Sequence, residues 1–193
     1  TWSRSFDFGD LPESYSTVLQ NLPSGPQHEV LRSTNLYLGA TVLTEPNGQP
    51  TPDATGDGAE EDGVNLPYRL WQNGTGGGSV TIEVGKGGGW LTGYIDFDKD
   101  GTFMQFGEMV ANQAVTVGTY TITFDLPTNT INATTTTVLN ARFRLFPSQP
   151  FIPELSFAGS TRNGEVEDYQ WIFGALGDTV WEDGNSNGTR EIW

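Results

Sequence analysis

The stretch Trp90-Leu91-Thr92-Gly93-Tyr94-Ile95-Asp96-Phe97-Asp98-Lys99-Asp100-Gly101-Thr102 joins two sequence patterns. In residues 90–95, apolar side chains alternate with small or polar ones, which predicts a β-strand with one buried face. In residues 96–102, carboxylates stand at every second position and a glycine follows, which is the spacing of the first half of an oxygen-ligand calcium loop. A strand that leads directly into such a loop differs from the helix–loop–helix of an EF-hand. We therefore predict a calcium-type loop on a β-scaffold.

The acidic loop supplies a candidate metal site, here called site one. Its predicted ligands are Asp96, Asp98, Asp100, the backbone carbonyl of Thr102, and Glu108. The bidentate glutamate that ends an EF-hand loop would fall on Gly107, so Glu108 stands one residue late. These oxygens, completed by water, suit Ca2+, which takes about six to eight oxygen ligands, whereas zinc and copper favour nitrogen or sulfur donors. The alternative interpretation is a solvated acidic turn.

Turn residues are spread along the 193-residue chain, which contains 25 glycines and 11 prolines. Between them, apolar patterns predict strands at residues 64–71, 79–84, 89–97, 119–126, 137–146 and 166–173. Glycine-rich connectors at 74–78 and 85–89 suit hairpin turns, and a short helix is expected over 106–114. Residues 30–42 are expected to form one or two strands, and residues 6–15 an acidic turn. Strands without alternating helices predict an all-β fold, an antiparallel β-sandwich of jelly-roll or Ig-like type with long acidic loops.

The chain carries a net charge of −15, from 24 acidic and nine basic residues. This excludes nucleic acid as a partner, because nucleic acids select basic surfaces. No segment has the roughly 20 apolar residues needed for insertion into a membrane. The acids occur in clusters, which favours discrete ion sites, and the alternative is a solubilising acidic surface. The chain has no cysteine, and a secreted domain without disulfides needs another means of stabilisation, for which calcium is suited.

The motif Gly164-Glu165-Val166-Glu167-Asp168-Tyr169 resembles the motif for which the GEVED domain is named. Further stretches resemble this family in the same order: residues 7–15, His28 with 36–39, 61–64, 94–101 with Phe103 and Gly107-Glu108, and 142–145. The resemblance implies a β-sandwich domain over residues 1–173, within a large secreted or surface-anchored bacterial protein. It also implies a calcium-type loop whose glutamate stands at the late position of Glu108.

After Phe173 the pattern changes. Residues 176–188 resemble the start of the B-type repeat of serine-aspartate adhesins, and their alternating oxygen ligands predict a partial metal site. Its residues are Asp183, Asn185, Asn187 and Thr189. We therefore expect residues 174–193 to be a tail that acts as a linker or as an intermolecular strand. Because Thr1 begins abruptly without a signal peptide, we expect a mature or trimmed piece of a longer protein.

A second complete metal site, called site two, is predicted from acids that are distant in the sequence. Its predicted ligands are Asp7, Asp10, Asp62, Glu165 and Glu167, with Asp168 beside them. On the last strand Glu165 and Glu167 share one face, while Val166 and Asp168 share the other. An ion there would attach the N-terminal segment to the final strand. The alternative is that these acids accept hydrogen bonds from backbone groups or pair with Arg142, Arg144 and Arg162.

The predicted function is structural or adhesive: a calcium-stabilised module of a secreted or surface-anchored bacterial protein, with self-assembly into a filament as a variant. Expected partners are neighbouring domains, copies of itself, or an extracellular glycan or protein. We predict no enzymatic activity, because the single histidine, His28, lies in no nucleophile motif and alternating loop acids are more typical of metal ligands than of a hydrolase. The alternative is a carbohydrate-binding module of a secreted hydrolase. Trp71, Trp90 and Trp171 are expected in the core rather than as sugar platforms.

Overall fold

A computed structural model describes residues 4–20, 24–31, 36–56, 63–66, 71–132 and 134–174. The regular secondary structure of these residues is nearly all β-strand, which confirms the predicted fold class. The strands are β1 (Phe6–Phe8), β2 (Gln27–Glu29), β3 (Tyr37–Leu38), β4 (Val64–Asn65), β5 (Gly74–Lys86), β6 (Gly89–Ile95), β7 (Met109–Val115), β8 (Gly118–Leu126), β9 (Thr137–Phe146), β10 (Ser160–Arg162) and β11 (Glu165–Phe173). Two single turns of 3-10 helix, η1 (Glu13–Tyr15) and η2 (Pro153–Leu155), interrupt the loops.

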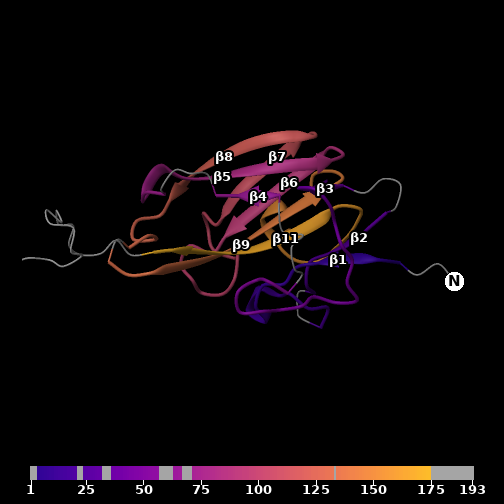
Figure 1. Ribbon diagram of the computed structural model, residues 1–193, viewed down its shortest axis with the longest axis horizontal. Helices are drawn as coiled ribbons and strands as arrows, with labels where there is room; N and C mark the ends of the chain where they lie inside the picture. Colours follow the sequence, from indigo (N-terminus) through magenta and orange to yellow (C-terminus); the bar gives the residue numbers. More distant parts are fainter. Residues whose placement is uncertain are drawn as a thin grey trace, which may run out of the picture.

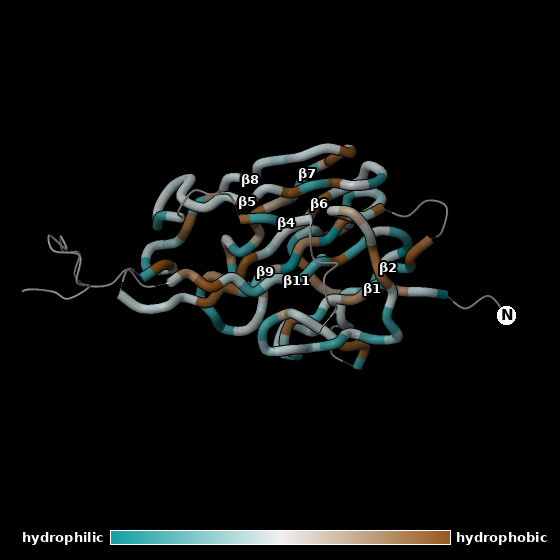
Figure 2. The backbone as a smooth tube through the Cα atoms, viewed as in Figure 1, coloured by the Kyte–Doolittle hydropathy of each residue, from teal (hydrophilic) through white to brown (hydrophobic). Residues whose placement is uncertain are grey.

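Two four-stranded antiparallel sheets form the sandwich (Figure 1). In the first sheet, β5 pairs with β3, β4 and β8; in the second, the strand order is β11-β9-β6-β7. Alternate side chains of both sheets point into a shared core, as expected for strands with a two-residue period. The fully buried members of this core include Leu38, Val80, Ile82, Leu91, Leu139, Phe143 and Leu145. Figure 2 shows hydrophobic and hydrophilic residues alternating along these strands.

The second sheet is also covered on its outer face, which makes the molecule three-layered. The covering layer is a small sheet in which β2 pairs antiparallel with β1 and parallel with β10, together with the turn that contains η1. Figure 1 shows β1 and β2 on the side of β11 that faces away from β5 and β8. A second apolar cluster fills this layer, formed by Leu11, Tyr15, Ala54, Tyr94, Phe103 and Phe157. Strand β9 therefore buries residues on both faces, including Arg142 and Arg144 on the outer one.

Four sequence predictions about elements were wrong, and one of these is the strand predicted over 64–71, because β4 ends at Asn65. The helix expected over 106–114 is strand β7, because Ala111 and Val115 face the core and the segment pairs along β6. Such short apolar runs fit a helix and a strand equally well, and pairing decides between them. Residues 74–78, expected as a connector, belong to the long strand β5. The expected acidic turn over 6–15 contains strand β1 and η1.

Two of the three tryptophans expected in the core lie there, and Trp90 does not. Trp71 and Trp171 are buried in the core, where their rings meet edge to face with centroids 5.5 Å apart. Trp90 is partly buried, and its indole Nε1 donates to the side-chain carbonyl of Asn112 at 2.7 Å. Within the described residues, no helix has the length and apolar character needed to cross a bilayer.

Candidate metal centre

Site one lies in the loop that connects β6 to β7. The two ends of this loop are held together, because Ile95 N donates to the backbone carbonyl of Glu108 at 2.9 Å. The first end is also attached to β9, because Asp96 N donates to the backbone carbonyl of Asn140 at 3.0 Å. Between these ends, Lys99 and Gly101 adopt left-handed backbone conformations with φ of 63° and 84°. Glycine takes such a conformation without steric cost, so Gly101 permits the sharp turn. The loop therefore places Glu108 beside Asp96.

Asp96 organises this loop. Its buried carboxylate accepts hydrogen bonds from Lys99 N at 2.6 Å, Gly101 N at 3.0 Å and the hydroxyl of Tyr15 at 2.5 Å. The same hydroxyl accepts a hydrogen bond from Asn140 Nδ2 at 2.8 Å. Burial raises the pKa of the Asp96 carboxyl, and these donors oppose the increase. Asp96 thus attaches the loop to η1 and to β9.

Three carboxylates converge in this loop. Asp96, Asp98 and Glu108 each place an oxygen within 4.8 Å of the others, and in the described part of the chain this is the group that has metal-ligand geometry. Glu108 has only 2% of its surface exposed. Its Oε2 accepts a hydrogen bond from Gln105 N at 3.1 Å, whereas no donor among the described residues reaches Oε1. A buried acceptor without a donor is rare and costs about 1–3 kcal/mol.

The electrostatics of the group favour a cation. Burial raises the pKa of Glu108 to about 7, and the negative charges of Asp96, Asp98 and Asp100 add to the increase. A bound cation would offset both the desolvation and the repulsion, and it would give Oε1 a partner. Because every ligand atom is a carboxylate oxygen, the group suits a hard cation such as Ca2+.

Two predicted ligands of site one lie outside this close group. Asp100 is exposed, and its Oδ1 accepts hydrogen bonds from the Thr102 hydroxyl at 2.9 Å and from Thr102 N at 2.8 Å. These donors lower the pKa of Asp100. The structure therefore brings three of the five predicted residues together, and ion binding by Asp100 and by the Thr102 carbonyl stays a prediction.

Three of the five carboxylates predicted for site two accept hydrogen bonds from backbone N–H groups. Asp7 Oδ2 accepts from Val166 N at 2.6 Å, and Glu165 accepts from Leu38 N. Glu167 accepts from Gly63 N at 3.2 Å and from the Tyr169 hydroxyl at 2.8 Å. The register with β9 confirms that Glu165 and Glu167 share one face of β11. These contacts match the alternative given for site two, and its ion stays a prediction because Asp62 lies outside the described residues.

A buried ion pair attaches the N-terminal segment to the last strand. Asp168 accepts two hydrogen bonds from Arg142, from Nε at 2.6 Å and from Nη2 at 2.7 Å, and neither side chain is exposed. Asp168 Oδ2 also accepts hydrogen bonds from Asp10 N at 2.8 Å and Leu11 N at 2.9 Å. The attachment predicted for an ion at site two is thus made by an arginine and a carboxylate.

His28 and Arg144 form a second buried polar contact under the covering layer. Arg144 Nε donates to His28 Nε2 at 2.9 Å, so the histidine proton resides on Nδ1, from which it reaches the carbonyl of Asn163 at 3.3 Å. Burial and the charge of Arg144 hold the pKa of His28 well below its usual value. Burial, with the charge of Arg142, lowers the pKa of Arg144 to about 9. These contacts give His28 a structural role.

Two residues that contact Asp96, Tyr15 and Asn140, were not predicted from the sequence. The roles of Tyr15 and Asn140 beside Asp96 come from segments 81 and 44 positions away from it. The partial third site, at Asp183, Asn185, Asn187 and Thr189, lies outside the described residues, as does the tail from residue 175 onward.

Comparison with known proteins supports the first resemblance. Residues 90–172 match the family of the GEVED domain. The matched range contains site one and the motif of residues 164–169, and it is shorter than the domain of residues 1–173 that the resemblance implies. No curated protein and no solved structure matches the chain. The resemblance of residues 174–193 to an adhesin repeat stays a prediction.

Proposed function

We propose, from the match of residues 90–172 to the GEVED domain, that the chain is a calcium-stabilised structural module of a secreted or surface-anchored bacterial protein. GEVED domains are typical of extracellular bacterial proteins. The observation that carries the proposal is the buried Oε1 of Glu108, which has no donor among the described residues and lies in a group of three carboxylates. A divalent cation is the partner that this group accommodates best.

Calcium is preferred over magnesium on the geometry of the group. Magnesium requires a tight octahedron at about 2.0–2.1 Å, whereas calcium accepts about six to eight oxygens at about 2.3–2.6 Å in a flexible arrangement. A loop with exposed and buried carboxylates, and with room for carbonyl and water oxygens, suits the larger ion. The net charge of −15 points the same way, because it attracts cations and makes the folded chain repel itself without them.

Ion binding would connect the second sheet to the covering layer. Asp96 and Glu108 stand at opposite ends of the β6–β7 loop, and Asp96 also accepts a hydrogen bond from Tyr15 in the covering layer. An ion that binds only the native state stabilises it by RT ln(1 + [L]/Kd), about 2.7 kcal/mol at a hundredfold excess over Kd. The proposed role is therefore mechanical and not catalytic: calcium stiffens a domain that links its neighbours.

Adhesion and filament formation are extensions of this proposal. In the filament variant, residues 174–193 of one copy add a strand to the sheet edge of another. Deletion of residues 174–193 would then abolish the concentration-dependent polymers seen by negative-stain electron microscopy. Polymers of unchanged length in the deletion variant would rule out this role for the tail.

The test of the calcium site is a set of thermal melts in excess calcium and in EGTA. The wild type should melt several degrees higher in calcium, and Glu108→Gln and Asp98→Ala should lose most of this increase. Glu154→Gln is the matched control, because Glu154 is an exposed carboxylate in η2 and its loss should leave the calcium effect intact. Identical melts of the wild type in both conditions, with no metal found by elemental analysis, would refute the proposal.

A further inference from the structure

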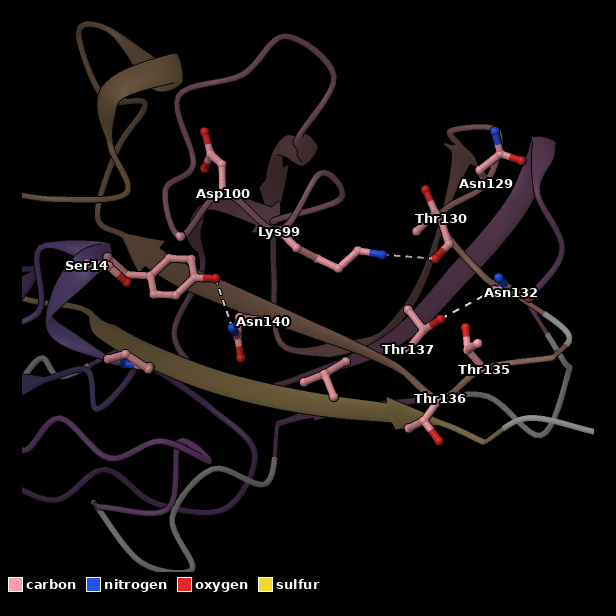
Figure 3. Close-up of a pocket in the computed structure, with 14 residues that line it drawn as sticks. Ser14, Lys99, Asp100, Asn129, Thr130, Asn132, Thr135, Thr136, Thr137 and Asn140 are labelled. Carbon is pink, nitrogen blue, oxygen red and sulfur yellow. Dashed lines mark hydrogen bonds between the residues drawn. The ribbon is translucent and has the colours of Figure 1, made fainter.

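Two hollows adjoin the β6–β7 loop and lie next to each other. The first, of about 550 Å³, lies between the loop and residues 129–138; the second, of about 450 Å³, lies between the loop and residues 127–130. Both are lined by Lys99, Asn129 and Thr130, so they form one groove. Figure 3 shows Lys99 extending from the loop toward Thr130, where its Nζ donates to the backbone carbonyl at 3.4 Å.

Site one opens into this groove. Asp98 and Glu108 line the second hollow, and Glu108 is the residue whose buried Oε1 has no donor among the described residues. Three carboxylates occupy part of the coordination shell of calcium, which takes about six to eight oxygens. An ion bound at site one would therefore have coordination positions that face the groove and accept oxygen atoms of a ligand.

An aromatic ring stands at the same place. Phe106 lines the second hollow, and its side chain is fully exposed. A single exposed apolar side chain is common on protein surfaces. An exposed phenyl ring beside an ion site, in a wall of amides and hydroxyls, has the composition of a ligand site in which an apolar surface is combined with a few placed polar groups.

The remaining wall is mostly polar, and its charged side chains are Lys99 and Asp100. It carries amide and hydroxyl side chains, namely Ser14, Asn129, Thr130, Asn132, Thr135 and Asn140. Amides and hydroxyls both donate and accept hydrogen bonds, so they match a ligand whose neighbouring groups also do both. Lys99 is the one cationic residue in the walls of the two hollows, and the net charge of −15 disfavours polyanions.

We propose that the groove binds an uncharged oligosaccharide, with calcium at site one as part of the binding site. This proposal rests on the proposed calcium site. A sugar ring has an apolar face of C–H groups, which would lie on Phe106, and a rim of hydroxyls, which would meet the ion and the amide groups. Carbohydrate binding, which the sequence left open as an alternative, thereby has a place in the structure that uses none of the buried tryptophans.

Hydrogen bonds connect residues that line the groove to Asp96, a predicted ligand of the ion. Tyr15 and Asn140 line the first hollow, and the Tyr15 hydroxyl bridges Asn140 to the carboxylate of Asp96. Lys99 N donates to the same carboxylate at 2.6 Å. Calcium bound to Asp96 would therefore hold the groove in its binding geometry. Because coupling between two ligands is reciprocal, the sugar should raise calcium affinity by the factor by which calcium raises sugar affinity.

The test is affinity electrophoresis of the whole chain in gels that contain a neutral polysaccharide: dextran, laminarin, xylan, glucomannan or galactomannan. At least one polymer should retard the protein in calcium, and EGTA should abolish the retardation. Phe106→Ala should weaken binding at least tenfold while leaving the calcium-dependent rise in melting temperature unchanged. Phe151→Ala is the matched control, because Phe151 is 99% exposed and lines neither hollow of the groove.

The outcomes separate this proposal from the calcium site. A wild type that gains no stability from calcium would refute the calcium site. A calcium-dependent rise without retardation by any of the polymers would refute the groove alone. Retardation that survives EGTA or Phe106→Ala would place the sugar elsewhere and overturn the groove. A calcium-dependent dimer in analytical ultracentrifugation, lost in Phe106→Ala, would show that a second copy of the chain occupies this surface.

Discussion

Replacement of Asp168 by asparagine tests how the covering layer is held. The carboxylate accepts four hydrogen bonds, two from Arg142 and one each from Asp10 N and Leu11 N, and neither charged side chain is exposed. Asp168→Asn removes the negative charge, leaves the guanidinium buried without a counter-charge, and turns an amide NH2 group toward donors. Removal of one partner of a buried ion pair costs about 3–5 kcal/mol. We expect a loss of about 4 kcal/mol, or a fall in Tm of roughly 8–16 °C for a chain of this length.

Urea unfolding followed by tryptophan fluorescence measures this loss, because Trp71 and Trp171 are buried in the core. Hydrogen exchange adds a local reading: the amides of Asp10 and Leu11 should lose protection more than those of β5. Glu154→Gln serves as the control for loss of one negative charge, and it should change stability by less than about 0.5 kcal/mol.

A double variant separates charge from packing. Asp168→Leu combined with Arg142→Met removes both charges, so it should cost less than the sum of the two single changes. A loss below about 1 kcal/mol in Asp168→Asn, or strict additivity in the double variant, would refute the view that this ion pair anchors the N-terminal segment.

Three further predictions follow from the same layer. Tyr15→Phe removes the hydroxyl that bridges Asp96 to β9, so stability in EGTA should fall by about 1–2 kcal/mol and calcium should bind more weakly; unchanged calcium melts would contradict this. Burial and the neighbouring guanidinium lower the folded-state pKa of His28, so the unfolded state binds the proton more tightly. The free energy of unfolding should therefore fall as the pH drops below about 6.5, by up to about 1.4 kcal/mol per pH unit. In urea unfolding between pH 6.5 and 5, His28→Gln should flatten this slope, and an unchanged slope would refute the assignment. Gly164→Ala should cost about 3 kcal/mol or more by urea unfolding, because φ is +115° and the new Cβ would lie 2.0 Å from a backbone carbonyl oxygen of β9, whereas Gly174→Ala has open space and should be neutral.

Local patterns were sufficient for most of the long sandwich strands and for part of site one. The strand over 89–97 was predicted from the two-residue period, and β6 ends at Ile95, where the acids begin. The contacts of Asp96 with Lys99 N and Gly101 N span three and five positions, so the spacing of acids and glycine determines the turn directly. The prediction of a helix over residues 106–114 was wrong because a short apolar run fits both the helical period and the two-residue period of a strand. Pairing along β6 selected the strand.

The sequence did not determine which groups the acidic side chains of the last strand would contact. Alternation predicted that Glu165 and Glu167 share one face of β11 and that Asp168 lies on the other, and the pairing with β9 confirms it. It could not predict that Asp168 would accept hydrogen bonds from a backbone segment 158 positions away. A carboxylate suits an ion, an arginine and a backbone N–H, and the choice depends on which group the fold brings near.

The sequence by itself thus determined most of the long strands, the acidic loop and the alternation of faces, because each depends on residues a few positions apart. Only the tertiary structure decided that Arg142 pairs with Asp168, that Tyr15 meets Asp96, and that Phe106 stands beside Glu108 in one groove. The physical reason is that the environment of a charge is set by the layers around it. Packing the N-terminal segment on the second sheet desolvated Asp96, Arg142 and Asp168 together, so each needed a partner that only the fold supplies.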